Sequence, residues 1–214
     1  AEQARPVYEE LVEVLRASTV VHADETGWRI GTLSAWLWVF TNREVTVYTI
    51  RRSLGHEVIV DILGQEFKVI LSSDCFLAYD HHELAQWLKQ KFVGHLLHTL
   101  REMEASKTRG AVRFARQVTA LLRETIQLKT EKPDLPSDVF AERSATLEQR
   151  LDALIHTRRR FTDPDNARFA KRLRKHRDHL LHFLYVDGLD ATNNQAERML
   201  RPAVITRKTT GCNR

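Results

Sequence analysis

Hydrophobic and polar positions in the first fifty residues predict one helix followed by an antiparallel group of strands. Residues 5–17 place their aliphatic side chains on one face of a helix. Three segments then carry the apolar or alternating pattern of strands, at 20–30, 35–40 and 45–50, with turn residues between them. Short turns between successive strands favour antiparallel pairing, so we expect a three-stranded meander.

A fourth strand is predicted to return to this meander. Residues 55–63 indicate a short helix, and the apolar segment 67–71 indicates the returning strand. Strands joined through a helix lie parallel across a right-handed crossover, so this strand should run parallel to an earlier one. Residues 80–90 then predict another helix.

Helical periodicity dominates the chain from about residue 95 to 182. Turn residues interrupt the apolar stripe at 132–136 and 163–166, and a long basic helix is expected to run to about Leu184. Alternating strands and helices in the first half and helices in the second indicate an α/β chain of the α+β type.

A last helix is predicted near the C-terminus. Thr192 and Gln195 have the spacing of a capping box, with a threonine at the N-cap and a glutamine three residues later. This helix carries Glu197, and Pro202 is expected to limit it.

Composition excludes a membrane span and disorder of the whole chain. The 214 residues carry 33 Lys and Arg against 28 Asp and Glu, a formal charge of +5, and 43% of them are apolar. No segment approaches about 18 uninterrupted apolar residues. Two cysteines suggest a reducing compartment, and no spacing of Cys and His fits a structural zinc site. The first residue is not Met, so we expect a fragment of a longer protein.

Two carboxylates occupy positions where strands could bring them together. Asp24 and Glu25 lie in the first strand and point in opposite directions, so only one of them can join a given site. Asp74 directly follows the fourth strand, and it would meet Asp24 if the two strands were parallel neighbours. Oxygen ligands of this kind favour Mg²⁺ or Mn²⁺, and a pair of such ions supports phosphodiester chemistry. A third carboxylate from a helix would complete the site.

Simpler interpretations of these residues stay open. Asp74 alone is also typical of a turn residue or a helix cap. Asp24 is also typical of a β-bulge or of an edge strand that avoids pairing with other chains. Glu197 and Arg201 have the spacing of a surface ion pair. His95 suits a hydrogen-bonded structural residue, and the basic stretch 158–177 suits either a solvated helix face or a face that follows phosphates.

Several motifs together resemble a known family. The segment TNNQAERMLRP at 192–202, with Arg207-Lys208 and GCNR at 211–214, closely resembles the end of the catalytic domain of bacterial DDE transposases of insertion-sequence family sixty-six. Further segments agree in order, namely DETGW at 24–28, SD at 73–74 with AY at 78–79, HLL at 95–97, and the helix from 166 to 177. Phe92 and His98 depart from the family pattern around His95.

The resemblance implies a ribonuclease-H-like fold, with a five-stranded mixed sheet in the order 3-2-1-4-5. A large helical insertion would separate strand 5 from the final catalytic helix. The expected division is a core at 1–100, a helical insertion at 101–186, and a return to the core at 187–214. Asp24, Asp74 and Glu197 would be the catalytic residues and the ligands of a two-ion Mg²⁺ site that also accepts Mn²⁺.

The function implied is that of a DNA transposase from a bacterial mobile element. It would hydrolyse phosphodiesters at transposon ends and transfer the ends into target DNA, in the cytoplasm at the nucleoid, as a homo-oligomer and with possible helper proteins of the element. The residues expected to contact nucleic acid are Arg198, Arg201, Arg207, Lys208, Lys171, Arg172 and Lys175. His95 and Asn194 would support the site. A structure-selective nuclease of the same fold and an inactive or domesticated DNA-binding module remain alternatives.

Overall fold

A computed structural model describes residues 4–192 and 194–210, which form two compact units. The first unit contains the chain up to Lys89 together with the C-terminal helix, and the second contains residues 90–192. The division at 1–100, 101–186 and 187–214 stays a prediction. Among the described helices, none combines the length and the apolar character that crossing a membrane requires.

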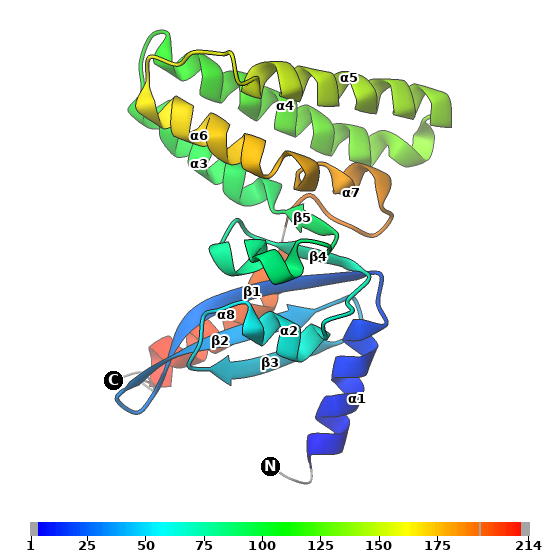
Figure 1. The fold of residues 1–214 in the computed structure, drawn as a ribbon, viewed down its shortest axis with the longest axis vertical. Coiled ribbons are helices and arrows are strands. Elements are labelled where there is room, and N and C mark those ends of the chain that lie inside the picture. The colour runs from blue at the N-terminus through cyan, green and yellow to red at the C-terminus, as the bar shows by residue number, and fades with distance from the viewer. Residues whose placement is uncertain (1–3, 193, 211–214) are drawn as a thin grey trace. The chain divides into compact units, whose positions relative to one another are not determined.

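The first unit is a sheet covered by helices on both faces (Figure 1). Its helices and 3-10 turns are α1 (Arg5–Arg16), α2 (Glu57–Leu63), η2 (Leu77–Asp80), η3 (His82–Leu84) and α8 (Asn194–Thr210). The strands of the sheet are β1 (Val20–Ile30), β2 (Leu33–Thr41), β3 (Thr46–Arg51), β4 (Ile70–Ser73) and β5 (Lys89–Lys91).

The described strands form one five-stranded mixed sheet in the order β3-β2-β1-β4-β5. β1 pairs antiparallel with β2, and β2 pairs antiparallel with β3. β1 pairs parallel with β4, and the last pair of this ladder is His22 with Ser72. The predicted meander, the parallel return of the fourth strand and the ribonuclease-H-like strand order are therefore confirmed.

The helix predicted at 80–90 is wrong. This segment consists of the short turn η3 and then β5. The Leu71 amide donates a hydrogen bond of 2.9 Å to the Leu88 carbonyl, so the backbone here pairs with β4. Pairing along the sheet satisfies the backbone groups that a helix would have bonded internally.

Side-chain alternation divides the sheet into two differently covered faces. Trp38 and Phe40 of β2 point into the main core, which α2 and the segment after β4 complete. Val39 lies between them in sequence and points to the other face, where Ala196 and Leu200 of α8 pack against it. In Figure 1, α8 (red) and α2 (cyan) accordingly lie on opposite sides of the strands.

The interpretation of Pro202 as a helix limit is wrong, because α8 continues through it to Thr210. Proline removes one hydrogen-bond donor from a helix interior. Contacts with the sheet continue beyond it, since Ala203 packs on the same face and Arg207 donates to the Gly27 carbonyl. The Gln195 side-chain amide donates to the Asn42 carbonyl, and the predicted capping box stays a prediction because residue 193 lies outside the described residues.

The second unit is helical apart from the end of β5. Its elements are α3 (Val93–Ser106), α4 (Ala111–Glu131), η4 (Lys132–Asp134), α5 (Ser137–Ile155), α6 (Pro164–Lys175), η5 (Arg177–His179) and α7 (His182–Tyr185). Helix α4 packs against α3, α5, α6 and α7, and so forms the centre of this unit. The predicted interruption at 132–136 is confirmed. The interruption predicted at 163–166 lies at 156–163 instead, because Asp163 caps α6 and the helix begins at Pro164. The long basic helix ends at Lys175.

Buried Gln90 in β5, at the start of this unit, is hydrogen-bonded to residues 180–183 near its end. Its side-chain amide donates to the Leu180 carbonyl at 2.8 Å, and its side-chain oxygen accepts from the Phe183 amide at 2.9 Å. Four polar groups, two of the backbone and two of the Gln90 side chain, are thereby satisfied away from water, where unpaired groups would be costly.

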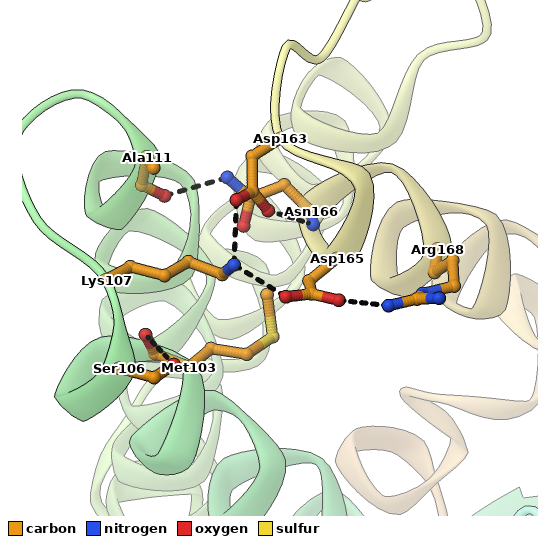
Figure 2. Close-up of polar contacts among 8 residues, drawn as sticks. All are labelled: Met103, Ser106, Lys107, Ala111, Asp163, Asp165, Asn166 and Arg168. Atoms are coloured by element: carbon orange, nitrogen blue, oxygen red, sulfur yellow. Dashed lines mark hydrogen bonds and ion pairs between the residues drawn. The ribbon is translucent and has the colours of Figure 1, made fainter.

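A lysine held by two aspartates joins α3 to α6 in this unit (Figure 2). The Lys107 ammonium donates to Asp163 at 2.8 Å and to Asp165 at 2.7 Å, and its side chain is only 9% exposed. Asp163 also caps α6 by accepting from the Asn166 amide. The hydrogen bonds from Lys107 are the main cause that lowers the pKa of each aspartate below its ordinary 3.8.

This clamp predicts a pH-dependent contribution to stability. A carboxyl group whose pKa is lower in the folded state than in the unfolded state stabilises the fold at pH values above its ordinary pKa. This contribution is lost as the pH falls through the pKa of the group in the folded state. We expect Lys107→Met to lower the thermal unfolding temperature at neutral pH, and the difference from wild type to shrink below pH 3.8. Thermal unfolding followed by circular dichroism over a pH series measures both effects.

Lys171→Met is the matched control, because Lys171 is an exposed lysine of α6 in the same unit. It should leave the unfolding temperature nearly unchanged. Equal losses in the two variants, or a Lys107→Met deficit that persists undiminished in acid, would contradict the role of the clamp.

Candidate active site

Asp24 and Glu25 point to opposite faces of the sheet, and the structure decides which face each one takes. Asp24 pairs with Val39, so it lies on the face that α8 covers. Glu25 pairs with Trp38 on the other face, where it accepts a hydrogen bond of 2.6 Å from the Tyr79 hydroxyl. Periodicity alone left this choice open.

Tyr79 holds Glu25 away from the face of α8. The phenol is fully buried, and burial followed by the negative charge of Glu25 raises its pKa well above 10. Asp24 and Asp74 raise this pKa further, so both of them lie within electrostatic reach of the same hydroxyl. Tyr79 therefore stays protonated at neutral pH and donates to Glu25.

Asp74 is placed by the parallel ladder between β1 and β4. The pairs of this ladder advance one residue at a time from Val20 with Ile70 to His22 with Ser72. Asp24 lies two residues beyond the last pair within β1, and Asp74 directly follows the end of β4. If the same register continued past β4, the two acids, 50 positions apart in sequence, would face the same way on neighbouring strands about 4.8 Å apart.

Local hydrogen bonds orient both aspartates. One carboxylate oxygen of Asp74 accepts from the Phe76 amide at 2.8 Å, and one of Asp24 accepts from the Glu25 amide at 2.9 Å. The Asp74 bond is an Asx-type turn, which is the ordinary role considered for an aspartate after a strand. Here the turn residue also follows the last pair of the ladder by two residues, as Asp24 does.

Glu197 is carried to the same end of β1 by α8. Gln195 lies at Asn42 and Thr41, and Thr41 pairs with His22. Twelve residues later, Arg207 donates to Gly27, so the helix runs in the same direction as β1. With a rise of about 1.5 Å per residue, Glu197 lies about 3 Å beyond Gln195, near the level of Asp24.

The helical spacing also fixes the side of α8 on which Glu197 lies. Ala196 and Leu200 face the sheet, and the Met199 carbonyl accepts from Tyr48 of β3 at 2.7 Å. Residues advance by about 100° around a helix, which puts Glu197 on the flank opposite Gln195 and Met199. That flank is turned away from β3, toward β1 and β4.

The three acids share one face but are not gathered around one point. Within the described residues, the ligand atoms of Asp24, Asp74 and Glu197 do not all lie within 4.8 Å of one another. Side-chain rotation would have to bring them together around an ion. The donor set fits Mg²⁺, because it consists of carboxylate oxygens and includes no sulfur or nitrogen.

Of the two residues considered as support, one belongs to the second unit and the side chain of the other is not described. His95 belongs to α3 in the second unit, and its ring lies edge-on to buried Phe92 at 5.7 Å between centroids. His98 is exposed beside Glu102 on the same helix. Asn194 begins α8, but its side chain lies outside the described residues, as do residue 193 and the motif at 211–214.

The expected DNA-contacting residues have different surroundings. Arg198, Arg201 and Lys208 are exposed on α8, whereas Arg207 is half-buried and its guanidinium donates to β1. In the second unit, Lys171 and Lys175 are exposed on α6 and Arg172 is half-buried.

Much of the positive charge at 158–177 is used within the second unit. Arg177 pairs with Asp152 and Glu148, and Arg168 pairs with Asp165. Two further arginines of this stretch donate to backbone carbonyls near the end of α5, namely Arg159 and Arg174. These four residues therefore have structural partners. Counting charges along the sequence could not distinguish such residues from residues that contact DNA.

Tyr79 is a residue of the site region whose role the sequence did not predict. It falls in the quoted motif at 73–79, but its partner Glu25 lies 54 positions earlier. No local pattern signals such a contact, because it depends on how the segment after β4 packs beneath β1.

Comparison with known proteins places the chain in a family. A model described as the Transposase IS66 family matches residues 1–214, and a search of curated proteins finds no match. Solved structures of the HTLV-2 integrase catalytic core domain in complex with magnesium match with 10% identity, in a trimeric form at a TM-score of 0.28 and in a dimeric form at 0.29. These matches cover 69% and 71% of this chain and 90% and 94% of the integrase chains. Since the family model spans every residue given, the chain belongs to the Transposase IS66 family.

Proposed function

We propose that this chain cuts and joins DNA at the ends of a mobile element, with Asp24, Asp74 and Glu197 as its catalytic carboxylates. The observations that support the proposal are the parallel pairing of β1 with β4, which ends two residues before Asp24 and Asp74, and the packing of α8 on the face that Asp24 takes. Membership of a transposase family supports DNA as the substrate.

Each carboxylate would act as a metal ligand that is positioned by regular structure. Asp24 is held by β1, Asp74 by the end of β4, and Glu197 by the flank of α8 that is turned toward them. Mg²⁺ bound by these residues would lower the pKa of the attacking oxygen and offset the charge that develops on the phosphate. The protein would supply little acid–base chemistry of its own.

Exposed basic residues on α8 would hold the DNA backbone near these carboxylates. Arg201 follows Glu197 by one helical turn, so it lies on the same flank. Arginine suits this role because its planar guanidinium matches the geometry of a phosphate. Such contacts would position the DNA without reading its sequence.

Conservative substitutions of the three acids should abolish catalysis. We expect Asp24→Asn, Asp74→Asn and Glu197→Gln each to reduce Mg²⁺-dependent cleavage by at least about 100-fold, since loss of even an outer-shell partner of a metal ligand costs about 10- to 100-fold. Labelled duplexes carrying the element's terminal sequence, resolved on denaturing gels, measure cleavage. DNA binding in a gel-shift assay should be largely retained.

Glu25→Gln is the matched control, because it removes the same charge from the next residue of the same strand on the opposite face. It should cleave at close to the wild-type rate. Equal losses in Asp24→Asn and Glu25→Gln would contradict the assignment. Cleavage by the wild type without any joined product would restrict the activity to that of a nuclease.

Arg201 and Arg207 of α8 should differ in their effect on salt dependence. Loss of one phosphate contact lowers the slope of log affinity against log salt concentration by about one unit. We expect this change for Arg201→Ala, measured by fluorescence anisotropy from low to moderate salt. Arg207→Ala should instead lower the unfolding temperature, because it removes donors to Gly27 and Thr26. An unchanged slope in Arg201→Ala would remove that residue from the DNA-binding surface.

A further inference from the structure

A second group of metal-ligating side chains lies on the other side of the sheet from α8. His56 precedes α2, His81 lies between η2 and η3, and Glu83 belongs to η3. Both segments pack on the core that Trp38 and Tyr79 share, which is the face away from α8. The ligand atoms of these three residues all lie within 4.8 Å of one another, the one group of three that meets this distance among the described residues.

The geometry of this group is unlike ordinary side-chain packing. The two imidazole rings are stacked at 3.3 Å between centroids, with an angle of 11° between their planes. Nε2 of His56 lies 3.2 Å from a carboxylate oxygen of Glu83. The partners come from segments 25 positions apart, so the cluster exists only because α2 and the turn after Tyr79 dock side by side.

Further donors surround these three residues. A carboxylate oxygen of Glu57 lies 3.6 Å from Nδ1 of His56, and the His82 ring lies 4.1 Å from the His81 ring between centroids. The His56 side chain is 21% exposed and that of Glu83 is 51% exposed, so an ion can reach the cluster from solvent.

The donor types indicate a different metal from that expected at the aspartates. Imidazole nitrogen is a softer ligand than carboxylate oxygen, and it favours Zn²⁺ and neighbouring transition metals over Mg²⁺. Two histidines and one glutamate also form a known type of zinc ligand set, in which water or another residue fills the fourth position.

We propose that His56, His81 and Glu83 bind one divalent transition-metal ion, with Zn²⁺ as the expected occupant. The lone pairs of the rings lie in the ring planes, so at least one of the stacked rings would have to rotate out of the stack to aim at a common ion. The bound ion would link the start of α2 to the end of the segment that begins at Asp74. It would stabilise the fold of that segment, and this structural role would not depend on cleavage or joining of DNA.

Titration of chelator-treated protein with ZnCl₂ alone tests the site directly. We expect calorimetry to show one tight equivalent in the wild type, and a saturating concentration of Zn²⁺ to raise the thermal unfolding temperature, because the ion binds the folded chain. His56→Gln and His81→Gln should each weaken this binding by at least about ten-fold. A hundred-fold excess of MgCl₂ should not displace the ion.

His98→Gln is the matched control, since His98 is an exposed histidine in the second unit. It should bind Zn²⁺ as the wild type does. Glu83→Gln is a milder variant that keeps both rings, and it should also weaken binding if the histidine variants prove unstable. Circular dichroism without metal verifies that each variant is folded.

Three results would overturn the proposal. They are the lack of a tight equivalent in the wild type, equal weakening by His98→Gln and His81→Gln, and displacement of the ion by Mg²⁺. None of these readouts uses cleavage, so failure of this site and failure of the proposed catalytic residues are distinguishable.

Discussion

The parallel pairing of β1 with β4 is the constraint on which the candidate active site depends. Its last pair is His22 with Ser72, and Asp24 and Asp74 each follow this pair by two residues. A shift of the register by one residue would turn one of them to the opposite face, where the apolar core lies. The helix α2 and the buried side chains beneath it hold β4 in this register, so the packing of one face determines the chemistry available on the other.

The two faces of the sheet also separate acids that are neighbours in sequence. Glu25 is engaged by the buried Tyr79 hydroxyl, whereas Asp24 faces α8 with Glu197 on its near flank. A half-buried carboxylate that accepts a hydrogen bond from a protonated phenol has a satisfied partner, which offsets the cost of its partial burial. The structure thus assigns a structural role to one acid of the pair and leaves the other for the proposed metal site.

Positive charge serves the fold as well as the proposed DNA surface. Lys107 joins α3 to α6 through two aspartates, and Arg177 joins η5 to α5 through an aspartate and a glutamate. Arg207 is engaged by β1 through Gly27. The basic residues that remain exposed, such as Arg201 and Lys171, are better candidates for contacts with phosphates than the total charge of a segment suggests.

The sequence by itself determined the local elements and which residues share a face. Alternation predicted that Asp24 and Glu25 point in opposite directions, and the motif resemblance predicted the strand order that is observed. Local signals failed where long-range contacts outweighed them. Pro202 lies within α8, because the contacts of this helix with the sheet continue on both sides of the proline. At 80–90, backbone pairing with β4 replaces the predicted helix.

Only the tertiary structure decided which face Asp24 takes, that Tyr79 holds Glu25, and that His56 meets His81. These contacts join segments 25 to 54 positions apart. Their physical origin is the docking of helices on a sheet, which depends on the shape of the whole core. A periodic pattern records only the direction of each side chain relative to its own backbone.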